Sequence, residues 1–130
     1  MSIKYKVTTE VFAEKHYLKK LRKKYKKTFA IPWLAFEIML SKFDIMLERE
    51  NTNSIVQIGD NILICKTEFK IMPNESTKSS GNRCIVVCNK NRQLVRVLLV
   101  YHKSDIIGVN ETVWWKKVVK ENYGEFKSYL

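Results

Sequence analysis

The chain has 130 residues, which suits one packed domain and is short for two domains of ordinary size. It carries 24 Lys and Arg against 13 Asp and Glu, a formal net charge of +11 at pH 7, and 45% of its residues are hydrophobic. The apolar fraction is normal for a globular core, and the cationic surplus favours a polyanionic partner such as nucleic acid, a ribosome or an acidic protein. The sequence has no long apolar run, and residues 1–7 do not form the apolar core of a signal peptide. We therefore expect a cytoplasmic protein with one domain over residues 1–130 and no membrane partner.

The N-terminal part of the chain predicts a short strand followed by two helices. Residues 3–7 alternate apolar and basic side chains, which is typical of a strand with one wet face. Apolar residues spaced by seven, three and four indicate one helix over 11–27. The segment 29–32 ends in proline, which favours the first turn of a new helix, so a second helix is predicted over 33–47. Its apolar stripe is wide enough that we expect it to be largely buried, antiparallel to the first helix.

Most of the positive charge lies near the N-terminus. Residues 1–30 contain ten Lys and Arg and two acids, a surplus of eight. A charge run is often only a solvated face, but mixed signs would serve that role better because they add helix-stabilising pairs. We therefore favour a polyanion-binding role for the first helix. Its candidate RNA-binding residues are Lys19, Lys20, Lys23 and Lys24.

The middle of the chain has β-strand patterns. Residues 62–72 alternate loosely and place Lys66 and Lys70 on the same side of a strand, while a small extra strand over 55–58 is left open. After a polar loop over 73–82, residues 83–88 and 94–101 are rich in β-branched side chains and apolar on both faces. Because an Asn-rich turn joins them, they predict a hairpin in the middle of a sheet.

Polar side chains gather at one end of this hairpin. The entrance of one antiparallel strand lies beside the exit of the next, so Arg83 should lie close to Tyr101, His102 and Lys103. Guanidinium matches phosphate oxygens with two parallel hydrogen bonds, and histidine is a suitable acid or base near neutral pH. Since Tyr101 and His102 alternate along the strand, only one of them can face the site. Arg96, the one charge in mid-strand, joins Tyr101 as an RNA-binding candidate.

The three cysteines, Cys65, Cys84 and Cys88, all lie inside strand patterns. Such positions and an odd number are typical of reduced, buried thiols. A metal site made by Cys84, Cys88 and His102 is the alternative interpretation, but the tight Cys-x-x-Cys spacing of most such sites is absent. We therefore predict no metal ion and no cofactor.

A last helix is predicted over 113–122, opened by Glu111 and Thr112 and ended at Gly124. The order of elements is then strand, helix, helix, strand, hairpin and helix. This order predicts an α+β fold in which two N-terminal helices pack on one face of a four-stranded antiparallel sheet, with a C-terminal helix in addition.

Three segments in this order resemble the RelE/ParE toxin superfamily of bacterial type II toxin–antitoxin systems. The first is the short strand that leads to the Lys-rich helix, with its motif over 12–25. The second is the strand with spaced lysines and the segment 78–87 that follows it. This segment is similar to the beginning of a strand that carries an arginine in the family. The third, 95–105, is similar to a closing strand that ends in a basic residue. Together the segments cover most of the chain.

The resemblance implies a RelE-like toxin that acts as a ribosome-dependent mRNA endonuclease, or mRNA interferase, and inhibits translation. Its partners would be a cognate antitoxin, the ribosome and mRNA. In RelE-like members a 2′-hydroxyl attacks the adjacent phosphate, while Lys and Arg on the sheet supply acid–base and electrostatic roles. By position, Arg83 matches the arginine that holds the scissile phosphate and Lys103 the basic residue after the last strand. The catalytic candidates are therefore Arg83, Lys103, His102, Lys66 and Lys70, and Tyr101 is a substitute for the tyrosine that many members carry after that strand.

Two other functions remain open. A ParE-like toxin directed at DNA gyrase would keep the fold without a nuclease centre, and a basic RNA- or ribosome-binding domain would need no catalysis. A cluster of Arg83, His102 and Lys103 on the side of the sheet away from the long helices favours the nuclease. An orientation of these side chains toward the helices would favour the alternatives.

Overall fold

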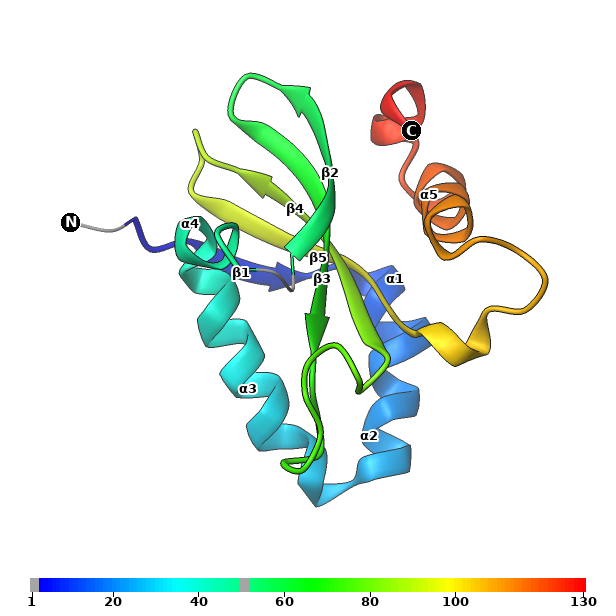
Figure 1. The fold of residues 1–130 in the computed structure, drawn as a ribbon. Coiled ribbons are helices and arrows are strands. Elements are labelled where there is room, and N and C mark those ends of the chain that lie inside the picture. Colours follow the sequence, from blue (N-terminus) through cyan, green and yellow to red (C-terminus); the bar gives the residue numbers. More distant parts are fainter. Residues whose placement is uncertain (1–2, 50–51) are drawn as a thin grey trace.

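A computed structural model describes residues 3–49 and 52–130 and has an α+β fold built on a five-stranded sheet (Figure 1). The strands are β1 (Lys6–Thr9), β2 (Thr52–Gly59), β3 (Ile62–Phe69), β4 (Asn82–Asn89) and β5 (Leu94–His102). Their order across the sheet is β1-β5-β4-β3-β2. Neighbours from β2 to β5 run antiparallel, whereas β1 pairs with β5 in parallel.

The predicted hairpin is confirmed, and β4 and β5 lie inside the sheet with Arg83 directly opposite Tyr101. The predicted number of four strands is wrong. The possible extra strand over 55–58 does form, as part of the longer edge strand β2. This strand pairs with β3, and the register between the two shifts at two places. Its first residues, Thr52 to Ser54, are polar and carry no alternating pattern, so pairing with β3 rather than local propensity defines this strand.

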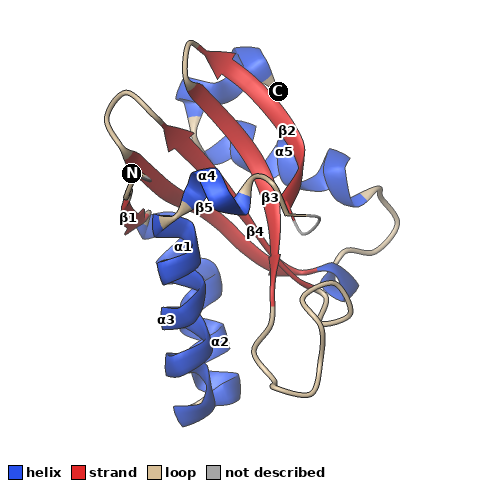
Figure 2. Cartoon of the chain, turned by 60° about the vertical axis from the view of Figure 1, so that its left-hand side comes forward, coloured by secondary structure: helices blue, strands red, loops and turns tan. Residues whose placement is uncertain are grey.

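The N-terminal helical region forms a hairpin on one face of the sheet (Figures 1 and 2). It consists of α1 (Val11–Ala13), the π-helical turn η1 (Glu14–Leu18), α2 (Lys19–Tyr25), α3 (Lys27–Ser41) and α4 (Phe43–Met46). The chain reverses at Lys26, whose φ of 51° is left-handed, so the break comes earlier than the predicted 29–32. Pro32 lies inside α3 and does not end it.

The sheet separates two hydrophobic cores. On one face, α3 packs its buried aromatic residues against β3, β4 and β5; the buried set includes Phe29, Trp33, Phe36, Cys65, Cys84, Val86 and Val97. On the other face lie α5 (Glu111–Asn122) and the 3-10 segment η3 (Gly124–Tyr129). Their core residues include Trp115, Val119 and Phe126, packed with Ile85, Val87 and Leu99. The expected placement of both N-terminal helices on one face is confirmed.

Helix α3 is less buried than its sequence predicted. Phe36 and Leu40 are buried, but Ile31, Leu34 and Ile38 are 79%, 57% and 50% exposed. The apolar stripe is wide because α3 carries apolar residues on its outer face as well as on its inner one. An apolar surface is therefore left open on the outside of the helical hairpin.

The three cysteines are buried and unpaired, and burial raises the pKa of each thiol, that of Cys88 to about 12. Within residues 3–49 and 52–130, no group of three or more His, Cys, Asp and Glu side chains is placed to hold a metal ion. Over the same described ranges, no helix has the length and apolar character needed to cross a membrane.

Candidate functional site

Arg83 lies on the face of the sheet that α5 covers. It is paired in register with Glu68 of β3 and Tyr101 of β5, and only 5% of its side chain is exposed. Its Nη2 lies 3.1 Å from Glu68 Oε2 and donates to the carbonyl oxygen of Lys78 at 3.2 Å, and its Nη1 donates to that of Asn82 at 3.1 Å. The guanidinium is therefore fixed by a carboxylate and by the loop that precedes β4.

Glu111, the first residue of α5, reaches the same cluster from above the sheet. Its Oε2 accepts hydrogen bonds from Lys66 Nζ and from the Tyr101 hydroxyl, both at 2.9 Å, and lies 3.8 Å from Arg83 Nε. Nitrogen or hydroxyl groups from three neighbouring strands thus converge on one carboxylate oxygen. We call Lys66, Arg83 and Tyr101, with Glu111 above them, the covered site.

The local sequence explains why Glu111 is placed there. Asn110 caps α5, its Oδ1 accepting hydrogen bonds from the backbone N–H groups of Thr112 and Val113 at 2.9 and 3.2 Å. A carboxylate in the first turn is also favourable at the positive end of the helix dipole. The ring of Trp114 packs edge-on against Tyr101 with centroids 5.0 Å apart, which keeps this turn over β5.

The electrostatics of the covered site keep Glu111 ionised and Tyr101 protonated. Burial alone would raise the pKa of Glu111, but the hydrogen bonds from Lys66 and Tyr101 outweigh it and hold that pKa below its ordinary value. Burial, reinforced by the Glu111 carboxylate, raises the pKa of Tyr101 far above its ordinary value, so its hydroxyl remains a donor. The site therefore presents a lysine, an arginine and a phenol to one carboxylate oxygen.

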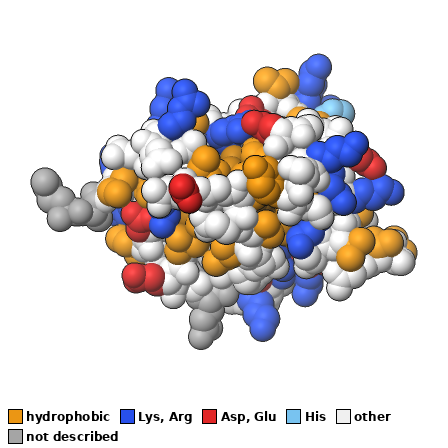
Figure 3. All heavy atoms as spheres, turned by 90° about the horizontal axis from the view of Figure 1, so that it is seen from above, with side chains coloured by type: hydrophobic (Ala, Val, Ile, Leu, Met, Phe, Trp, Pro, Cys, Tyr) orange, Lys and Arg blue, Asp and Glu red, His pale blue; other side chains and the backbone are white. Residues whose placement is uncertain are grey.

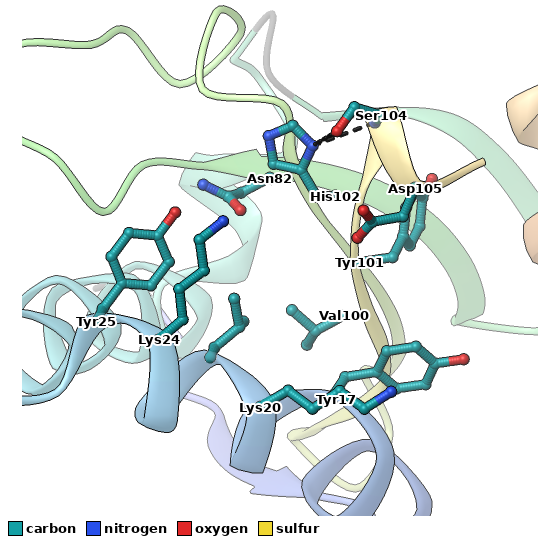
Figure 4. A pocket seen from close by; sticks show the side chains of 11 residues that line it. Tyr17, Lys20, Lys24, Tyr25, Asn82, Val100, Tyr101, His102, Ser104 and Asp105 are labelled. Carbon is teal, nitrogen blue, oxygen red and sulfur yellow. Dashed lines mark hydrogen bonds between the residues drawn. The ribbon is translucent and has the colours of Figure 1, made fainter. Parts of the chain in front are cut away.

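His102 does not join the covered site, and the expectation that it converges with Arg83 is wrong. It pairs in register with Asn82 and lines a pocket of about 200 Å³ together with Lys20 and Lys24 of α2 (Figure 4). Alternation along β5 places Tyr101 on the α5 face and His102 on the α2 face. Of these two neighbours, Tyr101 is the one that faces Arg83.

The hydrogen bonds of His102 are local. Its Nε2 lies 2.9 Å from the carbonyl oxygen of Ser80, and its Nδ1 accepts from the backbone N–H of Ser104 at 3.1 Å. Gly81 lies under the ring: a Cβ at this position would be 2.5 Å from ring atoms of His102. His102 therefore fastens the loop before β4 to the end of β5.

Three other predicted cations also lie outside the covered site. Lys103 is exposed and begins the 3-10 turn η2 (Lys103–Asp105) at the same end of the sheet. Lys70 follows the last residue of β3 and lines a groove beside α3, so the expected pairing with Lys66 on one strand face is interrupted by the end of the strand. Arg96 is held by Glu10 and Glu125, at 2.5 and 2.9 Å.

The predicted RNA-binding lysines are accessible. All four, Lys19, Lys20, Lys23 and Lys24, are exposed, and we call them the basic face of α2. Lys24 and Tyr25 extend from α2 toward Asn82 and His102 (Figure 4). Seen from above, Lys and Arg side chains lie around the periphery of the molecule, and hydrophobic side chains gather nearer its centre (Figure 3).

Sequence patterns did not identify Glu68 and Glu111 as members of the site. Glu68 falls between Lys66 and Lys70 in an alternating run, which is a weak signal for a charge paired inside the sheet. Glu111 is recognisable in the sequence only as a helix start, because its contacts depend on where α5 packs. The roles of both acids follow from the strand register and the position of α5.

A helical hairpin on one face of a mostly antiparallel sheet, together with a C-terminal helix, defines a RelE-like α+β fold. Among solved structures, the chain is similar to one described as an archaeal RelE–RelB complex from Pyrococcus horikoshii OT3. The TM-score is 0.54, and the match covers 79% of this chain and 99% of that chain at 12% identity. The RelE-like fold expected from the sequence is confirmed. No model of a known protein family matches the chain, and neither does any curated protein.

Proposed function

We propose that this protein is the toxin of a type II toxin–antitoxin system and cleaves mRNA on the ribosome. The RelE-like fold supports this proposal, and so does the cationic surplus of the chain. The observation that carries it is the convergence of Lys66, Arg83 and Tyr101 on a single oxyanion, at the strand entrance where the resemblance expects the scissile phosphate.

The chemistry of RNA cleavage fits these three side chains. The 2′-oxygen forms a bond to phosphorus, the bond to the 5′-oxygen breaks, and the products are a 2′,3′-cyclic phosphate and a 5′-hydroxyl. Negative charge grows on the non-bridging oxygens, where Arg83 and the Tyr101 hydroxyl donate hydrogen bonds. Lys66 gives a proton to the departing 5′-oxygen, while the proton of the 2′-hydroxyl passes to solvent.

The basic face of α2 provides a path for the RNA backbone to this site. Lys20 and Lys24 lie on the α2 side of the sheet end formed by the start of β4 and the end of β5. Lys103 is exposed at that end, and Arg83 lies on the opposite side of it. Phosphate contacts of this kind position a nucleic acid without reading its sequence, which suits binding to many mRNAs.

The outer surface of α3 is the proposed docking site for an acidic, amphipathic segment of a cognate antitoxin. A groove of about 650 Å³ runs between α3 and the residues after β3, lined by apolar residues such as Ile31, Met39 and Met72. Lys27 and Lys70 also line it, together with Glu68, whose carboxylate is paired with Arg83, so the groove would attract an acidic segment. The similar archaeal structure is a complex of RelE with RelB.

Co-expression with the product of an adjacent small open reading frame tests this docking site. Ile31→Asp should weaken the complex, because Ile31 lines the groove and is 79% exposed. Val113→Asp, at an exposed apolar residue of α5, should leave it intact. Equal binding of both variants would exclude the α3 groove as the interface.

Cell-free translation tests the proposed activity. Wild-type protein should arrest translation and leave cleaved mRNA, while Lys66→Met and Tyr101→Phe should each slow cleavage roughly a hundredfold, as loss of a transition-state donor does elsewhere. Lys117→Met, at an exposed lysine of α5, is the matched control. Arrest with intact mRNA would favour the RNA- or ribosome-binding domain. Inhibition of gyrase supercoiling without an effect on translation would favour the ParE-like alternative.

A further inference from the structure

We propose that Glu111 is an internal mimic of the RNA phosphodiester, so that α5 holds the covered site closed until RNA displaces this carboxylate. The identity of the displaced ligand rests on the proposed function. The mimicry itself rests on contacts within the chain: one oxygen of Glu111 receives the hydrogen bonds of Lys66 and Tyr101 and lies beside Arg83. An RNA phosphate would need these same donors.

The Glu111 carboxylate does not accept a hydrogen bond from every donor of the covered site. Arg83 Nε is buried and has no hydrogen-bond acceptor among the described residues, and its distance of 3.8 Å to Glu111 Oε2 is too long for a hydrogen bond. A buried N–H without an acceptor is unfavourable, so the site retains unused affinity for an oxyanion. A phosphate group presents its oxygens tetrahedrally and is able to bond Arg83 Nε as well as Lys66 and Tyr101.

Access to the site requires Glu111 to move. The side chains of Arg83, Lys66 and Glu111 are only 5%, 14% and 24% exposed. With Glu111 in place, the charges of Lys66 and Arg83 are offset by those of Glu68 and Glu111, so an incoming phosphate would meet two carboxylates. Displacement of Glu111 removes both the steric block and one of these negative charges.

The chain around Glu111 is built for a local movement rather than the release of all of α5. The segment before the helix is open: Ile107 is 88% exposed, and Gly108 has a φ of +82° with open space within 4 Å of the point that a Cβ would occupy. Farther along α5, Trp115 and Val119 are fully buried in the core. Lifting the first turn would break the Trp114–Tyr101 contact and the hydrogen bonds of Glu111, while the rest of the helix stays anchored.

A role for Glu111 as the general base is less consistent with these contacts. A base for this reaction works best with a pKa raised toward neutrality, whereas the hydrogen bonds from Lys66 and Tyr101 lower the pKa of Glu111. The two roles predict opposite effects of one substitution. Removal of a mimic should strengthen phosphate binding and preserve cleavage, whereas removal of a base should abolish cleavage.

The test is titration with a deoxydinucleotide, whose sugars lack the 2′-hydroxyl, so that its phosphodiester cannot be cleaved by this route. Binding is followed by NMR at the side-chain Nε–H of Arg83. Glu111→Gln should bind the dinucleotide roughly tenfold more tightly, because closure no longer reduces the fraction of binding-competent protein. Glu121→Gln, an exposed residue of the same helix, makes the same change in net charge and should alter binding less than about twofold.

The outcomes separate this inference from the proposed function. Equal affinities in wild type and Glu111→Gln, or equal gains in both Gln variants, would overturn the mimicry and leave mRNA cleavage standing. Tighter binding by Glu111→Gln alone, with no cleavage by any variant, would support the mimicry and reject the nuclease. If Glu111→Gln does not fold, Glu111→Asp replaces it: the shorter carboxylate should give an intermediate gain, and an unchanged or weaker affinity would overturn the proposal.

Discussion

Replacing one residue of the ion pair between Arg83 and Glu68 should destabilise the whole fold as well as disrupt the site. The two residues are 4% and 6% exposed, and their charged atoms lie 3.1 Å apart. Removing one member of a buried pair costs about 3–5 kcal/mol, because the remaining charge loses its compensation in a poorly solvated place. Arg83→Met should therefore lose a large part of the roughly 5–15 kcal/mol that stabilises a domain.

Removal of both charges should restore much of this loss. Replacement of a buried ion pair by apolar side chains of similar volume is often neutral or stabilising. The double variant Arg83→Met/Glu68→Leu should therefore be more stable than Arg83→Met alone by about 2 kcal/mol or more, which is the coupling expected for residues in direct contact. Its activity should still be lost, since Arg83 is absent from the covered site.

Urea unfolding, followed by tryptophan fluorescence and circular dichroism, measures these free energies by linear extrapolation. The control is Arg92→Met, at an exposed arginine in the turn between β4 and β5, which should stay within about 0.5 kcal/mol of wild type. A loss below about 1 kcal/mol for Arg83→Met, or a double variant no more stable than the single one, would refute the account of a buried pair. It would also make Arg83→Met a clean probe of catalysis.

Three further predictions follow from the site and its surroundings. Neutralising the basic face of α2 should flatten the dependence of log binding constant on log salt for single-stranded RNA by about 0.7 per lysine that contacts a phosphate; an unchanged slope would make this face only a solvated surface. Because the folded pKa of Glu111 is lowered, its stabilisation of α5 is complete at neutral pH and is lost progressively as pH falls below the ordinary pKa of a glutamate. An acid transition in tryptophan fluorescence should therefore be weaker in Glu111→Gln. Gly81→Ala should lower stability in the urea unfolding assay by about 1–3 kcal/mol, since the φ of Gly81 is +78° and the added Cβ would meet the His102 ring. Gly108→Ala, also at positive φ but in open space, should cost less in the same assay.

The hairpin could be predicted from sequence because its signals are local. Turn chemistry and apolar residues on both faces defined β4 and β5, and antiparallel register then placed Arg83 beside Tyr101. Alternation also required Tyr101 and His102 to face opposite sides. It could not say which side each helix covers, so the assignment of His102 to the α2 face needed the structure.

The remaining features depend on contacts between distant segments. The polar start of β2 forms a strand because it pairs with β3, and no local sequence pattern predicts it. Apolar residues on two sides of α3 predicted a largely buried helix, but Ile31 and Leu34 are exposed. Glu111 reaches the site only because α5 packs on the face of the sheet opposite α3. The sequence of the helix does not specify this tertiary packing.

The most direct test of the proposed activity is to map the ends of an mRNA during translation with purified ribosomes. The covered site predicts new 5′-hydroxyl and 2′,3′-cyclic phosphate ends with wild-type protein, strongly reduced with Tyr101→Phe and unchanged with Lys117→Met. Intact mRNA in the presence of folded wild-type protein, or equal cleavage by Tyr101→Phe, would contradict the assignment of RNA cleavage to this site.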